Sequence, residues 1–487
     1  MRSTTSRIFW RSLAIAAEKS CPLESNVKSF GEIPGPKPLP LLGNIWRYFP
    51  LIGEYSMERI HNSYFHMYEQ YGPLVREKLF STRTLVHVFD LEDMATVYKN
   101  EGRRPHRVSH RALEKYRKDR PHLYNGPGLF PSNGEEWYNF RRLFQRTLVD
   151  PRTAEACLSE LENITNDFIK RIPHLLDDKS EMDLQPELFS FAIECIGMIT
   201  LNKRLGCLTP EGNPAAAALV KAANDIHHAV FMTENTPIRY KKNYRILEAG
   251  MDLLSSTVSS YIKDSLEDPS SNKDCLLFKL MNAKNADTKD VFTMILDMFL
   301  AGIDTTAYSI GFGLYNLSIN KKVQERLREE LRERLPNQNS RFSDISQKIP
   351  YLQNVISETL RLNPVALGTG RVLPIDLVLS GYNVPAGTYI LLQHQVACMQ
   401  EKYFPNPHLF EPDRWLGDTP PLVSSPFGVG PRMCIGMRLA QKEIQLALSK
   451  MVLHYDMSYH YEPIGCKNRL INVPDRPLRL RLKRLQY

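Results

Sequence analysis

The most informative stretch of this sequence is Phe427-Gly-Val-Gly-Pro-Arg-Met-Cys434-Ile-Gly436. Glycine has no Cβ, so a loop with glycines on both sides of Cys434 can lie close to a flat ligand. A helical pattern runs from Met437 to about His454, and the free backbone N–H groups at a helix start can stabilise a thiolate. We infer that this loop presents one sulfur to a large planar group.

Composition excludes several classes of protein. The chain has 487 residues, of which 43% are hydrophobic and 24% charged, which is ordinary globular usage and not that of a disordered, collagen-like or coiled-coil chain. A net charge of +8 over this length does not require a nucleic-acid partner, and it suits an acidic protein or a membrane surface at least as well. The eight cysteines form no C-x-x-C pair, which argues against zinc ribbons, thioredoxin-like sites and a disulfide-built secreted protein. Apart from Cys434, we interpret them as inert small hydrophobes.

The amino terminus has the composition of a mitochondrial transit peptide. Residues 1–17 are rich in Arg, Ser and Thr and contain no acidic residue. No apolar run there approaches the roughly 18 residues that span a bilayer, so a signal anchor for the endoplasmic reticulum is not expected. We predict a transit peptide and leader over residues 1–32; the alternative is a basic tail with no targeting role. A stiff, proline-rich lead-in begins at Ile33.

Periodicity predicts a mainly helical protein with small β-sheets near its ends. Residues 55–70 are helical in pattern, residues 73–90 contain strand-like runs, and helical periodicity dominates from there to about Leu362. Strand signals return at 372–379 and 388–392. Length alone allows two to four domains.

Two pairs of residues at helical spacing, each weak on its own, and one group within an apolar helix carry further signals. Glu358 and Arg361 share a helix face and could be a solvated surface pair. Trp137 and Arg141 also share a face and could be a surface cation–aromatic pair. In the apolar helix 291–317, Gly302 is followed by Asp304 and Thr305, and side chains that compete for backbone hydrogen bonds could open the helix there. The alternative for Thr305 is a harmless hydrogen bond to its own helix.

The cysteine loop resembles the haem-binding signature of the cytochrome P450 family, Phe-x-x-Gly-x-Arg-x-Cys-x-Gly. The resemblance implies a cytochrome P450 fold, haem b as cofactor and O2 as co-substrate. It also implies that Cys434 is the axial thiolate of the haem iron, that Phe427 packs near the sulfur and that Arg432 meets a haem propionate.

The other motifs occur in the family's order and resemble its remaining elements. By resemblance, Thr305 would hold the oxygen and Asp304 would deliver protons, while Trp137, Arg141 and Arg371 would meet the propionates. Glu358, Arg361 and Arg414 would form a structural Glu–Arg–Arg cluster. Since residues 137, 305, 371 and 434 must meet one cofactor, we expect residues 33–487 to be one haem-thiolate domain.

The mitochondrial class of the family is similar at 101–107 and 133–137. That class takes electrons from an adrenodoxin-type ferredoxin and its reductase, and the positive net charge suits an acidic donor. Gln353, Ser357 and Met437 stand where the class commonly has basic residues, although Arg438 and Lys442 remain. We therefore expect a location on the matrix side of the inner mitochondrial membrane, with peripheral membrane contact.

A narrower resemblance, at 72–77, 109–117 and 119–125, is to the arthropod ecdysteroid 22-hydroxylase family known as disembodied. It implies hydroxylation of a sterol-like precursor in moulting-hormone synthesis. By family position, the pocket would draw on 116–124, the helix before Gly302, and 365–367. The alternatives are a mitochondrial or microsomal P450 that oxidises xenobiotics, a haem-binding protein without turnover, and a helical scaffold that binds peptides or lipids.

Overall fold

The computed structural model describes residues 27–49, 51–80, 83–236, 239–268, 275–335, 341–342, 349–417, 422 and 425–486. Most of the predicted transit peptide and leader, residues 1–26, lies outside this range. Contacts divide the chain into two compact units. The sheet unit takes in the chain up to Val108 together with Ala366–Leu409 and Arg414–Met433. The helical unit takes in Ser109–Val365, Phe410–Asp413 and the chain from Cys434 onward.

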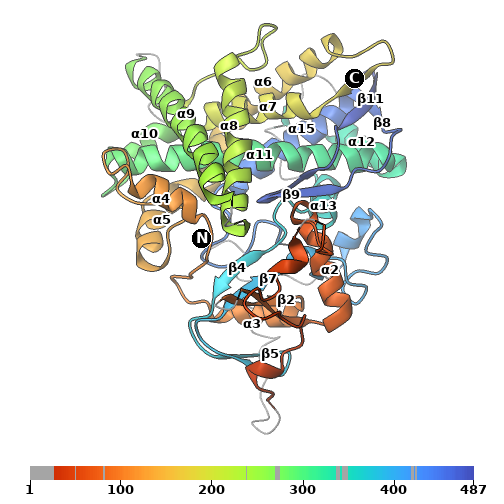
Figure 1. Ribbon diagram of the computed structural model, residues 1–487. Helices are drawn as coiled ribbons and strands as arrows, with labels where there is room; N and C mark the ends of the chain where they lie inside the picture. The colour runs from red at the N-terminus through yellow and green to blue at the C-terminus, as the bar shows by residue number, and fades with distance from the viewer. Residues whose placement is uncertain are drawn as a thin grey trace. The chain divides into compact units, whose positions relative to one another are not determined.

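The sheet unit is built on a four-stranded sheet in the order β1-β2-β7-β4 (Figure 1). Strands β1 (Leu74–Phe80) and β2 (Arg83–Val88) are antiparallel, β7 (Tyr389–Leu392) runs parallel to β2, and β4 (Thr369–Val372) runs antiparallel to β7. Burial alternates along β7, where Ile390 and Leu392 are buried, as expected for a strand with one core face, whereas β2 is buried continuously from Leu85 to Val88. Short helices and a hairpin complete the unit: α2 (Ile60–Tyr71), α3 (Leu91–Asn100), α14 (His394–Ala397), β5 (Leu377–Leu379) and β6 (Tyr382–Val384).

The strand signal at 372–379 marks two strands and not one. Strand β4 ends at Val372 and β5 begins at Leu377, with a bend at Pro374 between them. Proline has no N–H to donate to a strand ladder, which explains why the predicted strand signals divide between two strands.

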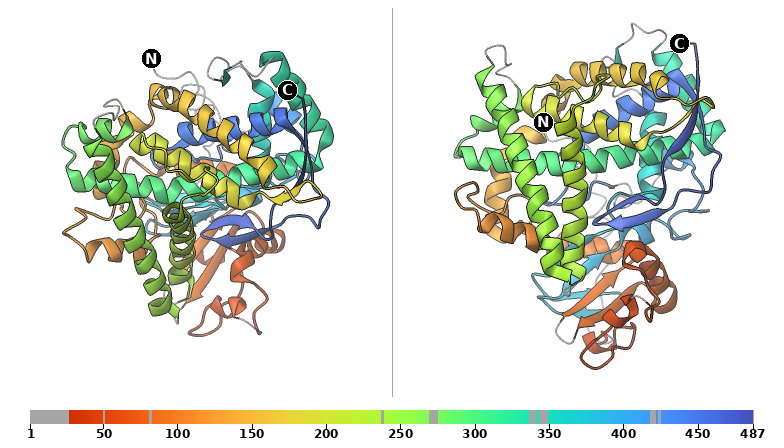
Figure 2. Two further views of the ribbon diagram at one scale, coloured as in Figure 1. Left: turned by 90° about the horizontal axis from the view of Figure 1, so that it is seen from above. Right: turned by 45° about the horizontal axis from the view of Figure 1, so that its top comes forward.

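The helical unit is organised around one long helix, α11 (Thr288–Ile319). Helices α7, α8, α13 and α15 all pack against it, and α8 and α9 lie side by side as a long pair (Figures 1 and 2). The helices are α4 (Arg111–Lys118), α5 (Gly134–Leu148), α6 (Pro151–Arg171), α7 (Gln185–Leu201), α8 (Pro214–Asn235), α9 (Tyr240–Glu267), α10 (Leu276–Met281), α11, α12 (Lys321–Arg334), α13 (Pro350–Leu362) and α15 (Met437–His454).

Two small sheets complete the helical unit. One has the order β3-β11-β8, with β3 (Glu181–Asp183), β8 (Tyr455–Ser458) and β11 (Arg479–Arg484). The other pairs β9 (Cys466–Arg469) with β10 (Ile471–Pro474). Helix-rich architecture with small sheets agrees with the fold class that the sequence predicts.

Helix α11 is continuous, so the prediction that Gly302, Asp304 and Thr305 open it was wrong. The structure gives Gly302 a different reason. A Cβ on Gly302 would lie 3.0 Å from Cδ1 of Ile196 on α7, so glycine allows the two helices to approach closely. In length and apolarity α11 could cross a membrane, but 72% of its apolar window is buried inside the protein, as expected for a core helix.

Candidate functional site

The cysteine loop is shaped by two glycines with left-handed backbone. Gly428 and Gly430 have φ angles of +75° and +76°, which glycine adopts without strain. The Gly428 N–H donates to the Ser425 carbonyl oxygen at 2.9 Å, and the Met433 N–H donates to the Gly430 carbonyl oxygen at 3.2 Å. Helix α15 then begins at Met437, as predicted. Cys434 therefore sits three residues before a helix start.

Cys434 is exposed as a residue, yet burial of its sulfur raises the pKa of the thiol above its ordinary value. Hydrogen bonds from the backbone N–H groups of Gly436 and Met437 and the positive charge of Arg141 act in the opposite direction and lower this pKa. These donors are what a sulfur needs when it ligates a cation as an anion.

The other cysteines of the described chain differ from Cys434, because each is buried or half-buried. Burial raises the pKa of Cys157 and of Cys466 to about 11 and raises the pKa of Cys195 further above its ordinary value. Such thiols stay protonated at neutral pH. Cys21 lies outside the described residues.

Trp137 and Arg141 lie on α5 and are almost completely buried, at 2% and 4% exposure. The Arg141 guanidinium lies 5.6 Å from the centre of the Trp137 ring, and its Nε donates to Oε1 of Gln145 at 2.9 Å. Burial lowers the pKa of Arg141 to about 10, while the nearby Cys434 raises it. A cation held at this cost in a buried place is well suited to an anionic ligand.

Arg371, Phe427 and Arg432 belong to the sheet unit. Arg371 is buried on β4, pairs with Glu101 through Nε, and donates from Nη1 to the Gly370 carbonyl oxygen at 2.8 Å. Arg432 donates to the Pro105 carbonyl oxygen from Nε at 3.3 Å and from Nη2 at 3.1 Å, and Phe427 is half-buried.

Helix α11 has one partly exposed patch within its otherwise buried length. Of residues 293–318, all described, only Ala301, Gly302 and Thr305 are not buried. These positions share one face, and the Thr305 hydroxyl donates to the Ala301 carbonyl oxygen at 2.6 Å. Of the two residues predicted to act on oxygen, Thr305 thus lies at this partly exposed patch, whereas Asp304 is buried.

Asp304 lies on another face of α11 and is 1% exposed. Nδ1 of His227 on α8 lies 2.8 Å from its Oδ2, and Nδ2 of Asn224 donates to its Oδ1 at 3.2 Å. Asn224 in turn accepts a hydrogen bond from the Tyr308 hydroxyl at 3.1 Å. The sequence analysis did not identify His227 or Asn224, because nothing local marks residues that are about 80 positions from their partner.

The Glu358–Arg361 pair is part of a buried network. Both side chains are 0% exposed, Arg361 Nε donates to Glu358 Oε2 at 2.8 Å, and the Glu411 N–H donates to Glu358 Oε1 at 2.9 Å. The weak alternative of a solvated surface pair is therefore excluded. Arg414 belongs to the sheet unit, where its Nη1 donates to the Pro405 carbonyl oxygen at 3.1 Å.

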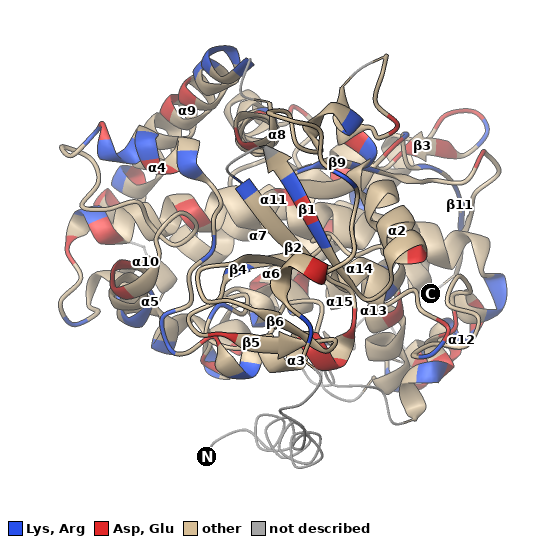
Figure 3. Cartoon of the chain, turned by 60° about the horizontal axis from the view of Figure 1, so that its bottom comes forward, with Lys and Arg blue, Asp and Glu red and all other residues tan. Residues whose placement is uncertain are grey.

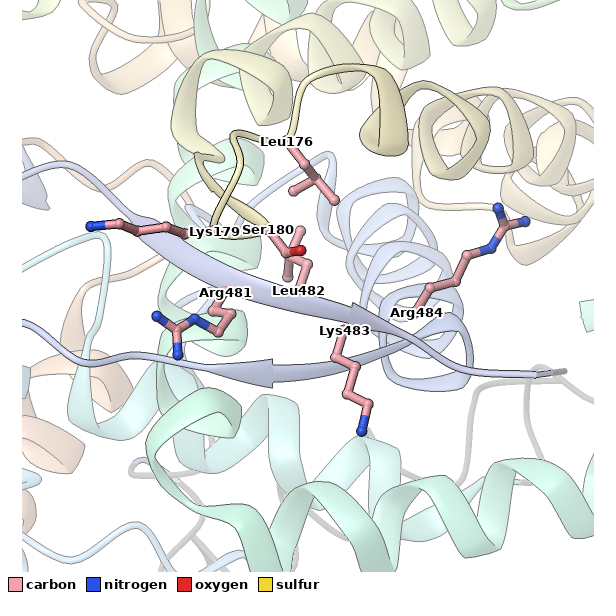
Figure 4. A pocket seen from close by; sticks show the side chains of 7 residues that line it. All are labelled: Leu176, Lys179, Ser180, Arg481, Leu482, Lys483 and Arg484. Atoms are coloured by element: carbon pink, nitrogen blue, oxygen red, sulfur yellow. The ribbon is translucent and has the colours of Figure 1, made fainter.

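A different, basic pocket lies on the surface of the helical unit (Figure 4). Its lining includes Lys179, Arg481, Lys483 and Arg484 around β11, and none of the predicted site residues. Arg481 is already paired with Glu181 at 2.9 Å, so part of this charge is neutralised. Elsewhere on the surface, charges of both signs alternate along α9 and α12 (Figure 3).

The residues present fit a haem with a thiolate ligand. In the helical unit, Cys434 has backbone donors, Arg141 is a buried cation beside it, and α11 carries the hydroxyl of Thr305. Cys434 would hold the iron and Arg141 a propionate; in the sheet unit, Arg371 and Arg432 are the guanidinium groups that the resemblance relates to propionates.

Comparison with known proteins agrees with this chemistry. The family model described as Cytochrome P450 matches residues 33–480. The chain is 34% identical to "Cytochrome P450 302a1, mitochondrial" of Drosophila melanogaster over 94% of this chain and 96% of that protein. It is 30% identical to the mitochondrial 1,25-dihydroxyvitamin D(3) 24-hydroxylase of Rattus norvegicus, covering 94% and 90%. It is 28% identical to the ecdysone 20-monooxygenase of Drosophila melanogaster, covering 93% and 88%.

Proposed function

Because this chain belongs to the cytochrome P450 family, and is a monooxygenase that uses haem b, we propose that it hydroxylates carbon 22 of an ecdysteroid precursor in mitochondria. The choice of substrate rests on the segment 109–125, which resembles ecdysteroid 22-hydroxylases. This segment forms a fixed wall against α11. Relatives named as steroid and secosteroid hydroxylases support a sterol-like substrate.

A buried ion pair fixes this wall to α11. Arg117 Nη2 lies 2.6 Å from Asp297 Oδ1, with both side chains at most 1% exposed, and the Leu129 N–H donates to Asp297 Oδ2 at 2.7 Å. The Tyr124 ring stacks on Phe292 at 5.9 Å between centroids. A wall held in one position selects a rigid substrate by shape, which suits a sterol nucleus better than a range of flexible xenobiotics.

The chain's own residues manage the protons of the reaction. Bound haem supplies the activation of O2 that places one oxygen atom in a C–H bond and releases the other as water, using two electrons and two protons. Cys434 would hold the iron as a thiolate, and the N–H groups of Gly436 and Met437 would stabilise its charge. Thr305 presents a hydroxyl at the partly exposed patch of α11, and Asp304 holds a carboxylate on the same helix with polar partners behind it. In this proposal Asp304 is the proton source of the helix, and its carboxylate is reached from the α8 side through His227.

We further propose a mitochondrial ferredoxin as electron donor. Arg438 and Lys442 lie one turn apart at the start of α15, and both are partly exposed. Gln353, one of the neutral residues where a basic one is common, accepts a hydrogen bond from Gln445 of α15 at 3.0 Å. The basic contribution thus comes from α15, which supports a weaker donor contact than a full set of cations gives.

Peripheral membrane contact belongs to the same proposal. Within the sheet unit, Leu41, Leu51 and Ile52 expose 84%, 103% and 67% of their surface. Leu41 and Leu51 also have positive φ angles of 63° and 77°, which cost energy for a side chain of this kind. Exposed leucines at such turns support contact with an apolar phase.

The deciding experiment is turnover of the protein with a mitochondrial ferredoxin and its reductase, using ecdysteroid precursors with and without a 22-hydroxyl group. Products are located by mass spectrometry. We expect new oxygen at carbon 22 only when that position is free. Oxidation at another sterol position, or oxidation of xenobiotics alone, would reject the substrate; failure of the ferredoxin to reduce the haem would reject the mitochondrial donor.

A further inference from the structure

The segment that follows α3 touches both arginines of the sheet unit that are expected to meet haem. Its first residue, Glu101, is 5% exposed and forms an ion pair with Arg371 of β4. Four residues later, the Pro105 carbonyl oxygen accepts from Arg432 of the cysteine loop. The sequence analysis related this segment to the mitochondrial class but gave it no role.

Backbone contacts hold the segment in place between these two arginines. His106 and Val372 form an antiparallel bridge, in which the Val372 N–H donates to the His106 carbonyl oxygen at 2.9 Å. The Tyr389 hydroxyl donates to the Val108 carbonyl oxygen at 3.2 Å. Because Val372 directly follows Arg371 on β4, the position of the segment also sets the position of that guanidinium.

The bonds of Arg371 leave one end of its guanidinium for a ligand. Nε is used by Glu101 and Nη1 by the Gly370 carbonyl, and the ring of Tyr98 lies 5.3 Å from the guanidinium carbon. In the described part of the chain, Nη2 donates no hydrogen bond that would compete. An arginine fixed at two of its three nitrogens presents the third in one direction, which is how a carboxylate ligand is oriented.

Both arginines also act electrostatically on the carboxyl group of Glu101. Burial raises the pKa of its carboxyl, while Arg371 and Arg432 lower it. Gly430 lies against the same carboxylate, because a Cβ at this position would overlap Glu101 Oε1. The cysteine loop, β4 and the end of α3 therefore meet at one acidic side chain.

We propose that Glu101 is a positioning residue for haem. It fixes Arg371 so that Nη2 is left for a haem carboxylate, and it supplies the counter-charge for the buried guanidinium of Arg371. The inference rests on the proposed propionate role of these two arginines, and it is independent of substrate and electron donor.

The first test compares Glu101→Gln with Asp93→Asn in the full-length haem protein. Gln keeps the shape and an acceptor for Arg371 but removes the charge. Asp93 is a matched control, because it lies on α3, its pKa is also raised by burial, and it is hydrogen-bonded to Ser380 and not to an arginine. The readouts are the rate of haem transfer to excess apomyoglobin, the midpoint potential of the haem, and the melting temperature.

We expect Glu101→Gln to lose haem about tenfold faster than wild type, the usual cost of losing a residue that orients a ligand-holding group. We also expect a more positive midpoint potential, because removing a buried negative charge disfavours the ferric state. Asp93→Asn should change neither quantity. If both variants lower only the melting temperature and leave haem transfer and midpoint potential unchanged, Glu101 stabilises the fold without positioning haem, and the proposal is wrong.

A second pair of variants tests the same contact if Glu101→Gln fails to fold. Gly430→Ala and Gly428→Ala introduce the same backbone strain in the same loop, since the two φ angles differ by about one degree. Only the Cβ at 430 would displace Glu101, whereas at 428 the nearest atom is 3.9 Å away. Faster haem loss in Gly430→Ala than in Gly428→Ala supports the proposal, and equal rates overturn it. Neither test uses a steroid, so failure of the proposed function would be seen separately, in the turnover experiment.

Discussion

Asp297 and Asp304 lie two turns apart on α11, are each 1% exposed, and have partners of different kinds. Asp297 accepts from the guanidinium of Arg117 at 2.6 Å. Asp304 lies against the imidazole of His227 at 2.8 Å and the amide of Asn224 at 3.2 Å. One helix thus carries two buried carboxyl groups in contrasting electrostatic surroundings.

The difference shows how the same residue type can serve structure or chemistry. An arginine keeps its proton throughout the physiological range, so the Asp297 pair stays charged and closed. An imidazole nitrogen can act as donor or acceptor, and an amide carries no charge, so Asp304 is not locked into a charged pair as Asp297 is. We therefore propose that Asp297 stabilises the wall formed by residues 109–125 and that Asp304 delivers protons.

The largest effect is expected when the Asp297 pair is broken. Asp297→Asn leaves the Arg117 charge buried without its counter-ion, which costs about 3–5 kcal/mol. We expect a loss of this size in the free energy of unfolding, measured by urea denaturation, and a reduced yield of haem-loaded protein. The control is Glu114→Gln on α4, which breaks an exposed i,i+4 pair with Lys118 and should cost less than about 1 kcal/mol. Equal costs for the two variants would show that the buried pair does not hold the wall.

Asp304→Asn should act on the reaction more than on the fold. The amide keeps the shape and an acceptor for Asn224, but it cannot deliver a proton, so we expect product formation to fall about 100-fold, the lower end of general acid–base contributions. The measurement is product formed per NADPH consumed, together with urea denaturation. An Asp304 variant that keeps wild-type coupling but unfolds as readily as Asp297→Asn would reverse the two assignments.

The sequence predicts well those parts of this comparison that are local. The start of α15 at Met437, the helix that carries Glu358 and Arg361, and the cysteine loop follow from glycines and side-chain periodicity within a few turns of chain. The same holds for the placement of Asp304 and Thr305 on one long apolar helix.

The partners could not be predicted in this way. Arg117 and Asp297 are 180 positions apart, and their pairing depends on how α4 packs on α11. The prediction that α11 opens near Gly302 was wrong for a related reason, since the glycine accommodates Ile196 of another helix. Long-range packing is the information that periodicity does not contain.

A third buried acid, Glu443 on α15, extends the comparison to a pH dependence. Burial raises its pKa to about 8, from an ordinary value of 4.5. Because the folded pKa lies above the unfolded one, the folded protein binds more protons between these values. Its contribution to stability is therefore complete below about pH 4.5 and is lost as the pH rises toward 8.

Glu443→Gln should remove this dependence of the free energy of unfolding on pH. We expect the wild-type free energy of unfolding to fall, relative to that of the variant, by roughly 3 to 4 kcal/mol between pH 5 and pH 8. The control is Asp150→Asn, because Arg152 lowers the pKa of Asp150 to about 2 and its titration lies outside this range. It should lower stability equally at both pH values. The same slope in wild type and Glu443→Gln would contradict a neutral Glu443.

The smallest effect is expected at His227, and it sharpens the difference between the two aspartates most directly. His227→Gln can keep a hydrogen bond to Asp304 but cannot exchange a proton. A hydrogen bond contributes about 0.5–1.5 kcal/mol net, and the variant keeps this bond to Asp304. We therefore expect the product formed per NADPH to fall only about threefold. His228→Gln on the neighbouring position of α8 is the matched control, and it should leave coupling unchanged. If His227→Gln is as coupled as wild type across pH 6 to 8, protons reach Asp304 by another route, and His227 only holds the carboxylate in place, as Arg117 does for Asp297.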